Sequence, residues 1–278
     1  DEMAGKGYRV LGFAVKIIPT LPHKLNINEI ESSLTFIGFA CLIDPPRAEA
    51  KDAVEQCKQA GIIPVMITGD HKLTAESIAG KLGFISSGSD LILEGKELEK
   101  LSDDEFKNIV ERVRVYARVN PEQKLRIISA LQAKHHFVAM TGDGVNDAPA
   151  LKNADIGIAM GINGTEVSRE ASDMILLDDN FATIVKAVRL GRTIYNNILK
   201  FINYIMSGNT GEILAIVLAP FFGLPIPLLA IHILWVNLVS DGLPGLALAY
   251  EKPESNIMNI PPRDTQENIF SGKTAFRI

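Results

Sequence analysis

The chain has 278 residues, of which 47% are hydrophobic and 22% charged, and its formal net charge at pH 7 is −5. This mild acidity argues against nucleic acid as a partner, because binding to phosphate backbones needs basic surface. Cys41 and Cys57 give neither a metal-binding spacing nor a disulfide framework. Cys41 lies in an apolar run, so we expect a buried thiol and a reducing compartment. The first residues do not have the pattern of a signal peptide. The chain opens mid-pattern and without an initiator Met, so we expect part of a longer protein.

Two strand-like runs lie near the N-terminus, at residues 8–15 and 34–43. The stretch 18–31 between them contains Pro and Asn, which predicts an irregular linker. Asp44-Pro45-Pro46-Arg47 follows the second run, and its prolines stiffen the chain and keep the preceding residue out of the helical region. Residues 48–60 then have helical spacing.

Strands and helices alternate from residue 62 to residue 177. The predicted strands are 62–67, 115–119, 137–140, 154–161 and 173–177, and the predicted helices are 73–82, 103–113, one from Pro121, one from Ala148, and 165–171. The polar stretch 86–104 predicts turns. This alternation is typical of a doubly wound α/β fold, a parallel sheet covered by helices on both faces. We expect one such domain at roughly residues 30–190.

The turn Thr68-Gly69-Asp70 directly follows one of the buried strands. A single Thr-Gly-Asp is commonly a plain turn, but the same tripeptide recurs at residues 141–143 after another strand. Two such turns indicate one shared site, in which Thr68 and Gly69 would bind a phosphate oxygen. Lys124 lies in the first turn of the helix from Pro121, where an isolated lysine is usually a solvated charge.

The stretch Met140–Leu151, MTGDGVNDAPAL, is the most informative in the chain. Gly142 and Gly144 let the backbone turn sharply and approach a ligand closely. Asp147 is expected to cap the following helix, which has Pro in its first turn. Asp143 and Asp147 would lie at the carboxyl end of a strand, where open α/β sheets bind ligands. Two carboxylates beside backbone N–H groups suit Mg2+ held against a phosphate.

TGDGVNDAPAL resembles the hinge motif of P-type cation-transporting ATPases, whose phosphorylation domain is similar to haloacid-dehalogenase hydrolases. The resemblance extends over nearly the whole chain and includes ARVNPEQK around Lys124. It implies that the Lys124 ammonium offsets charge on the phosphoryl group, with Arg118 as a weaker candidate for the same role, and that Asn146 hydrogen-bonds the phosphoryl oxygens. An Arg at the place of Arg9 would contact ATP phosphates, although a surface Arg on an edge strand is an equally open interpretation.

The pattern turns helical from Phe181, and residues 213–240 contain no Asp, Glu, Lys or Arg. Because a transmembrane helix needs about 20 apolar residues, we predict two spans, roughly 197–219 and 227–250, joined by a tight turn. Basic residues before the first span, with Lys252 and Arg263 after the second, place both ends in the cytoplasm. A buried helical hairpin in a soluble protein is the alternative.

Polar residues inside such spans are costly and therefore need a reason. Five share helix faces in two groups: Asn209 with Glu212, and Asn237 with Ser240 and Asp241. Gly242 loosens the second helix, and Pro244 leaves the Ser240 carbonyl without its helical donor. The resulting all-oxygen site suits Ca2+, and the lack of a Cys or His pair argues against Cu+ or Zn2+.

SGNTGE and WVNLVSDGLP resemble the fifth and sixth transmembrane helices of calcium pumps of the sarcoplasmic-reticulum type. The resemblance implies two ion sites, one formed by Asn209, Glu212, Ser240 and Asp241 and the other by Asn237 and Asp241. Related sodium pumps also place acids here, so a Na+/K+ or Mn2+ pump remains an alternative. The domains would then be the end of a nucleotide-binding domain with a linker (1–29), the phosphorylation domain (30–190), stalk and two spans (191–250), and a cytoplasmic loop (251–278).

The family's phosphorylated Asp lies in a DKTGT motif, which this sequence lacks. We therefore expect the chain alone neither to hydrolyse ATP nor to transport. The parent would be a multi-pass membrane protein with its phosphorylation domain in the cytoplasm, and would use ATP and Mg2+ to form an aspartyl phosphate and move Ca2+ across the bilayer. A soluble phosphatase would need a nucleophilic Asp in the chain and no spans. A non-catalytic haloacid-dehalogenase-like membrane fragment would keep the fold without Mg2+ or phosphate affinity.

Overall fold

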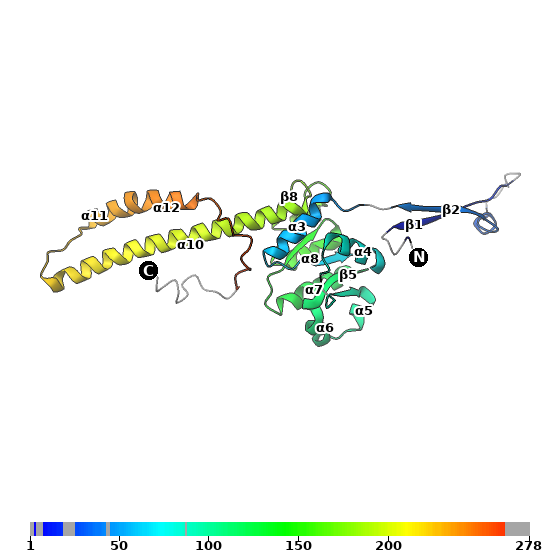
Figure 1. The fold of residues 1–278 in the computed structure, drawn as a ribbon, viewed down its shortest axis with the longest axis horizontal. Helices are drawn as coiled ribbons and strands as arrows, with labels where there is room; N and C mark the ends of the chain where they lie inside the picture. The colour runs from blue at the N-terminus through cyan, green and yellow to red at the C-terminus, as the bar shows by residue number, and fades with distance from the viewer. Residues whose placement is uncertain (1–2, 4–7, 19–25, 43–44, 87, 265–278) are drawn as a thin grey trace. The chain divides into compact units, whose positions relative to one another are not determined.

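A computed structural model describes residues 3, 8–18, 26–42, 45–86 and 88–264 of the chain (Figure 1). The chain divides into two compact units. Unit 1 comprises Asp1–Val54 and Pro64–Asp179, and unit 2 comprises Glu55–Ile63 and Asn180–Ile278. Each unit is described by itself below.

An antiparallel hairpin forms the first part of unit 1. β1 (Arg9–Val15) pairs with β2 (Thr35–Leu42), and the short helix α2 (Ile27–Ile30) lies in the predicted linker. Both strands agree with the sequence-based prediction. Cys41 is exposed, so the prediction of a buried thiol is wrong. The reason is that β2 pairs with β1 in a two-stranded sheet and does not join the parallel strands.

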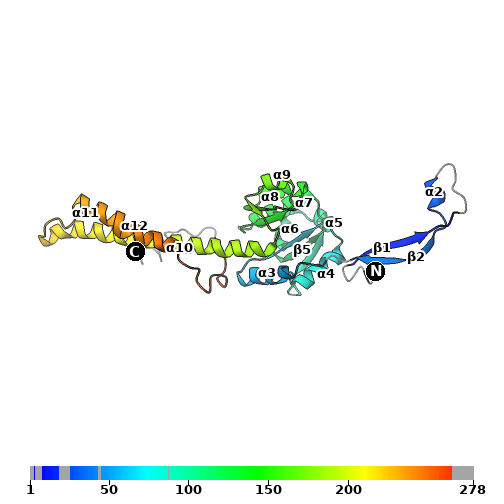
Figure 2. The ribbon, with the colours of Figure 1, turned by 90° about the horizontal axis from the view of Figure 1, so that it is seen from above.

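The parallel strands of unit 1 form two three-stranded sheets (Figures 1 and 2). One has the order β3-β5-β4, with β3 at Met66–Thr68, β4 at Leu91–Glu94 and β5 at Val113–Ala117. The other has the order β6-β7-β8, with β6 at Ala139–Gly142, β7 at Ile156–Met160 and β8 at Met174–Leu176. The predicted parallel α/β architecture is therefore confirmed, but as two sheets whose edge strands β3 and β6 are not hydrogen-bonded to each other.

Helices follow the strands, and all of them in this unit except α2 and α5 agree with the sequence-based prediction. They are α3 (Ala48–Gln59), α4 (Lys72–Leu82), α5 (Gly95–Lys100), α6 (Asp103–Ile109), α7 (Pro121–Gln132), α8 (Ala148–Asn153) and α9 (Glu166–Glu170), with 3-10 turns η1 (Val110–Arg112) and η2 (Val145–Asp147). The N-cap of α7 is Asn120, which exchanges hydrogen bonds with Gln123 in a capping box. The stretch 86–104 was predicted as turns but contains β4 and α5. Both elements are short, and neither shows a clear hydrophobic period.

The core of the first sheet centres on Tyr116 of β5. Its ring packs edge-on against Phe106, with 6.2 Å between the ring centroids, and Leu98 and Ile127 belong to the same buried cluster. The Tyr116 hydroxyl is buried and has no hydrogen-bond partner among the described residues. Burial also raises the pKa of Tyr116.

Tyr116→Phe is expected to raise the free energy of unfolding by about 1 kcal/mol, because it removes a buried hydroxyl that has no partner. Urea unfolding of the detergent-solubilised chain, followed by circular dichroism, measures the change. Tyr250→Phe is the control, since Tyr250 is 83% exposed. A clear loss of stability in Tyr116→Phe would show that the hydroxyl is hydrogen-bonded.

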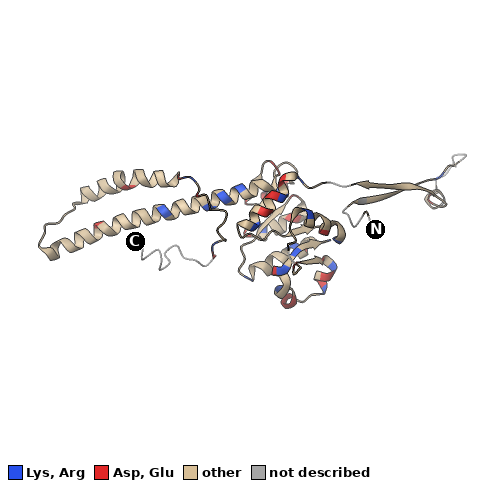
Figure 3. Cartoon of the chain, viewed as in Figure 1, with Lys and Arg blue, Asp and Glu red and all other residues tan. Residues whose placement is uncertain are grey.

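Unit 2 is built on α10 (Phe181–Leu218), a helix of 38 residues. The 3-10 turn η3 (Ala219–Phe222) ends it, and α11 (Ala230–Trp235), the π-helix η4 (Val236–Asp241) and α12 (Gly242–Ala249) return alongside it (Figures 1 and 2). The helical segments Phe181–Phe222 and Ala230–Ala249 are long and apolar enough to cross a membrane. Charged residues are concentrated in the first half of α10 and are sparse in the later helices (Figure 3).

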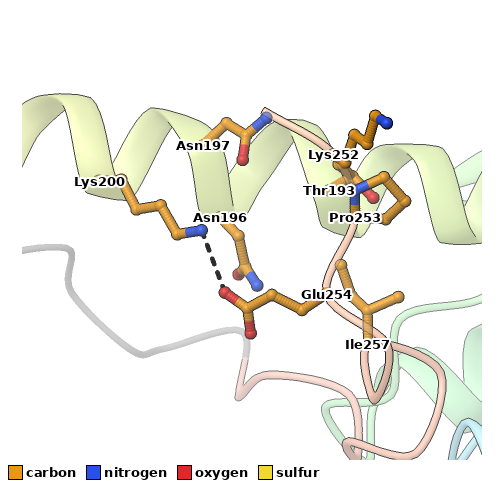
Figure 4. A pocket seen from close by; sticks show the side chains of 8 residues that line it. All are labelled: Thr193, Asn196, Asn197, Lys200, Lys252, Pro253, Glu254 and Ile257. Carbon is orange, nitrogen blue, oxygen red and sulfur yellow. Dashed lines mark ion pairs between the residues drawn. The ribbon is translucent and has the colours of Figure 1, made fainter. Parts of the chain in front are cut away.

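The segment after α12 is held against the charged part of α10. Arg192 donates to the carbonyl oxygens of Ala60 (2.7 Å), Ile257 (3.0 Å) and Ile260 (2.7 Å). Five residues farther along α10, Asn197 donates to the carbonyl oxygens of Ala249 and Glu251. Lys200 pairs with the carboxylate of Glu251 at 2.8 Å. It also pairs with the carboxylate of Glu254 at 3.1 Å (Figure 4). These contacts fix where the second apolar helix ends relative to α10.

Candidate functional site

The carboxyl end of β6 carries a nearly buried ion pair. Lys124, in the first turn of α7, lies 2.5 Å from Oδ1 of Asp147, and their side chains are 17% and 11% exposed. The other carboxylate oxygen of Asp147 accepts from the backbone N–H groups of Asp143 (3.4 Å) and Gly144 (3.1 Å). Asp147 therefore joins α7 to the turn after β6.

Asp147 does not cap α8 with its side chain, so that part of the prediction is wrong. The 3-10 turn η2 intervenes, and it places Asp147 at the third position after Gly144, where its carboxylate folds back onto the Gly144 amide. Gly142 is required for this arrangement. A Cβ at that position would lie 2.6 Å from the Cβ of Asp147.

Asp143 has a firmly held backbone and a free side chain. Its carbonyl oxygen accepts from the Thr165 N–H at 2.8 Å and the Ser168 hydroxyl at 3.1 Å. Its carboxylate is exposed and makes no hydrogen bond or ion pair within the described part of the chain. A free carboxylate beside oriented backbone amides is a suitable ligand for Mg2+, which prefers one or two carboxylates together with water and phosphate oxygens.

The turn after β3 is tied to the segment that leads into α7. The Thr68 hydroxyl accepts from the Asp70 N–H and donates to the Asp70 carboxylate, both at 3.1 Å. The Asp70 carbonyl accepts from the Arg118 N–H, and the Thr68 carbonyl from the Val119 N–H. A Cβ at Gly69 would meet nothing within 4 Å, so this face of the turn is open.

The structure therefore connects most of the predicted phosphate-site residues through the start of α7. Residues 118 and 119 hold the Thr68 turn, and Lys124 holds Asp147. Asn146 is exposed on η2 and touches none of them in the described hydrogen-bond network, and the Arg118 side chain is also exposed. The side chain of Arg9 lies outside the described residues.

Sequence reasoning missed Thr165 and Ser168. Thr165 is the N-cap of α9, and a Thr before a short helix was a visible signal for a cap. Nothing in the sequence indicated that the carbonyl of Asp143 is a partner of this helix, because 22 to 25 residues separate them.

The second group of predicted site residues lies on α10 and η4. Asp241 is buried, and its Oδ2 atom has no partner among the described residues, as is also true of Glu212 Oε1. Asp241 faces α10 at Gly208, where a Cβ would lie 3.5 Å from Asp241 Oδ2. Asn237 and Asp241 line a cavity of about 440 Å³ between α10 and α12. A buried polar atom without a partner calls for an explanation, and a bound ion is one such explanation.

The helix irregularity predicted at this point takes the form of a π-helix, which carries Asn237, Ser240 and Asp241. π-Helical turns often occur at functional sites. The Ser240 carbonyl, expected to be free, accepts from the Tyr204 hydroxyl at 2.9 Å. The Ser240 carbonyl oxygen keeps a second lone pair that this hydrogen bond does not use. Within the described residues no hydrogen bond or ion pair joins Asn209 or Glu212 to Asp241, and no group of three His, Cys, Asp or Glu side chains gathers there.

Comparison with known protein families matches both parts of the chain. Residues 16–155 match the model for haloacid dehalogenase-like hydrolases, and residues 225–278 match the model for the C-terminus of cation-transporting ATPases. The chain belongs to the P-type cation-transporting ATPases, with a haloacid dehalogenase-like domain. The α/β domain and the two apolar helical segments of this P-type ATPase chain fit the family assignment.

Individual relatives support the same family. A calcium-transporting ATPase of Bacillus subtilis is 51% identical over 277 residues, covering 100% of this chain and 31% of the relative. Calcium-transporting ATPase 1 of Lactococcus lactis is 49% identical over 271 residues, covering 98% of this chain and 30% of the relative. Cation-transporting ATPase pma1 of Synechocystis is 46% identical over 278 residues, covering 100% of this chain and 31% of the relative. The chain thus spans about a third of the length of these relatives.

Proposed function

We propose that the chain is the phosphorylation domain and part of the ion pathway of an ATP-driven pump that transports Ca2+. The observation that carries the proposal is the pair of unpaired buried carboxylate oxygens, on Glu212 and Asp241, in helices able to span a membrane. The Lys124–Asp147 pair beside the free Asp143 carboxylate supports the phosphoryl-transfer half. Relatives named calcium-transporting support the choice of ion.

The phosphate site would stabilise transfer of the γ-phosphoryl group of ATP to an Asp outside this chain, forming an aspartyl phosphate. Thr68 and Gly69 would hydrogen-bond one phosphoryl oxygen and Asn146 another, and the Lys124 ammonium would offset their charge. Bound Mg2+ supplies further charge stabilisation at these oxygens. Asp70 closes the Thr68 turn, and the exposed Arg118 stays a weaker candidate for a phosphate contact.

The two carboxylates of the motif would have different roles. Asp143 is free to bind Mg2+ directly, whereas both oxygens of Asp147 already accept hydrogen bonds. Direct binding of Mg2+ by Asp147 stays a prediction, and its contact with Lys124 favours a positioning role instead. Arg9 as an ATP contact likewise stays a prediction.

The segment with the nucleophile would lie between the two parallel sheets. β3 and β6 are edge strands, and the Thr-Gly-Asp turns that they carry belong to the proposed phosphate site. A strand inserted between these edges would bring its carboxyl end to both turns. Because the sequence lacks a DKTGT motif, the chain alone is expected to be inactive.

The ion site would lie in the membrane, with unit 1 in the cytoplasm. Basic residues in the first half of α10 and after α12 favour this orientation. The transported ion would be bound by residues of other segments together with oxygen atoms of five residues of this chain, Asn209, Glu212, Asn237, Ser240 and Asp241. The proposed division of the chain into domains stays as predicted from the sequence: the phosphorylation domain at 30–190, the spans at 197–219 and 227–250, and the loop at 251–278.

The decisive experiment follows acid-stable phosphoenzyme formation from labelled ATP in the intact parent protein. Phosphorylation is expected with micromolar Ca2+ and not with Na+, K+, Mn2+ or Mg2+ alone. Glu212→Gln should raise the Ca2+ concentration that gives half-maximal phosphorylation at least tenfold, because the ion loses a charged ligand. Glu254→Gln is the matched control, since Glu254 pairs with Lys200 outside the proposed ion site.

Other outcomes identify the alternatives. Phosphorylation triggered by Na+ or Mn2+, or indifferent to Glu212→Gln, keeps the P-type mechanism and overturns the Ca2+ assignment. A parent protein that forms no phosphoenzyme with any of these ions supports the non-catalytic membrane fragment.

A further inference from the structure

Asp143 lies between two glycines, so its backbone would be mobile without outside contacts. Gly142 and Gly144 give the chain wide conformational freedom on both sides. Yet both polar backbone groups of Asp143 are held. Its N–H donates to Asp147 at 3.4 Å, and its carbonyl oxygen accepts from Thr165 and Ser168. The direction of the free carboxylate therefore depends on groups that are distant in sequence.

The contact from Ser168 is fully enclosed. Ser168 is 0% exposed, and its hydroxyl hydrogen is shared between the carbonyl oxygens of Asp143 at 3.1 Å and Thr165 at 2.8 Å. The Thr165 hydroxyl donates to Ser168 Oγ at 3.1 Å and accepts from the Ser168 N–H. Both hydroxyl groups are thus hydrogen-bonded, and the Ser168 hydroxyl together with the Thr165 N–H holds α9 to the turn after β6.

The segment that leads into α9 is itself fixed. The Asp179 carboxylate accepts from the N–H groups of Ile162 (3.0 Å) and Asn163 (2.8 Å). Gly164 packs closely on β7, because a Cβ there would lie 1.8 Å from the Met160 carbonyl oxygen. With this loop fixed, Thr165 and Ser168 provide a rigid base and not a mobile one.

We propose that Thr165 and Ser168 position Asp143 for metal binding and thereby set the affinity of the phosphate site for Mg2+. The proposal rests on the proposed function, in which Asp143 binds the metal directly. Residues that orient a metal ligand commonly change metal affinity when they are replaced, even though they do not touch the ion. Ser168 is a positioning residue in this sense.

The test titrates Mn2+, a magnetic substitute for Mg2+, into the full 278-residue chain in detergent and measures free Mn2+ by electron paramagnetic resonance. Only the Mn2+ binding that Asp143→Asn removes is assigned to this site. Mn2+ bound by the residues of the membrane helices is thereby excluded. Ser168→Ala is expected to weaken that binding three- to tenfold, the effect of losing one hydrogen bond to a buried group. Ser172→Ala, which removes a hydroxyl bonded to the Arg169 carbonyl, should change it less than twofold.

Ser168→Cys is a second variant, of nearly the same shape but with a weaker donor, and its affinity should fall between those of wild type and Ser168→Ala. This variant still tests the proposal if Ser168→Ala folds poorly. If Asp143→Asn removes Mn2+ binding but both Ser168 variants bind as wild type does, the positioning role is wrong. If Asp143→Asn removes no binding, the metal site of the proposed function is wrong instead.

Discussion

Asp147→Ala is expected to lower the free energy of unfolding by about 3–5 kcal/mol, the usual cost of removing one partner of a buried ion pair. Lys124 would be left charged with its side chain only 17% exposed. The amide groups of Asp143 and Gly144 would also lose their acceptor. This exceeds the effect of breaking a surface ion pair, which is at most about 1 kcal/mol.

Asp143→Asn is the matched control for this substitution. It changes a carboxylate four residues away in the same motif, but that carboxylate is exposed and has no contact in the described network. Its stability should stay within about 0.5 kcal/mol of wild type, while its Mn2+ binding is lost. Stability and Mn2+ binding would then show independently that Asp147 is a positioning residue and that Asp143 is a metal ligand.

A double-mutant cycle identifies the source of the loss. Lys124→Met in the Asp147→Ala background should recover part of the stability, because it removes the uncompensated charge. We expect a coupling energy of roughly 0.5–3 kcal/mol from urea unfolding of the four proteins. If Asp147→Ala proves no more destabilising than Asp143→Asn, the ion pair has no structural role.

Local signals in the sequence were sufficient for most of unit 1. Pro121 after Asn120 marks the start of α7, and Gly83 ends α4 in the left-handed region with φ of 81°. Both signals act within a few residues, so they can be seen in the sequence. Helix α5 has no comparable pattern. Its capping box begins with Glu94, which is also the last residue of strand β4.

The side-chain partners in the site depended on contacts between distant segments. Asp147 was expected to cap α8, but Lys124 and the Gly144 amide compete for its carboxylate and hold it. The Ser240 carbonyl was expected to be free, but Tyr204 on the facing helix donates to it. In each case the sequence identified the polar group correctly, and only the fold identified its partner.

Asp241→Asn is expected to change ion affinity and stability in opposite directions. In the intact parent the affinity for Ca2+ should fall roughly ten- to a hundredfold, because the site loses one of its charged ligands. Without Ca2+ the variant should be at least as stable as wild type. Asp241 is buried with one carboxylate oxygen unpaired, and a neutral amide costs less in that place.

Equilibrium binding of labelled Ca2+ measures the affinity, and thermal unfolding in a chelator measures the stability. Glu254→Gln again serves as the control, because its carboxylate pairs with Lys200 at the end of the helix pair. It should leave the affinity for Ca2+ unchanged and lower stability by no more than about 1 kcal/mol.

The opposite signs are what distinguish an ion ligand from a structural residue. A carboxylate kept for packing or for an ion pair would stabilise the empty protein, so Asp241→Asn would then lower stability both with and without Ca2+. A ligand is retained at a cost to the empty protein, because its unpaired oxygen is stabilised only by the bound ion. Loss of stability in the chelator together with unchanged Ca2+ binding would therefore remove Asp241 from the ion site and leave it as a helix-packing residue.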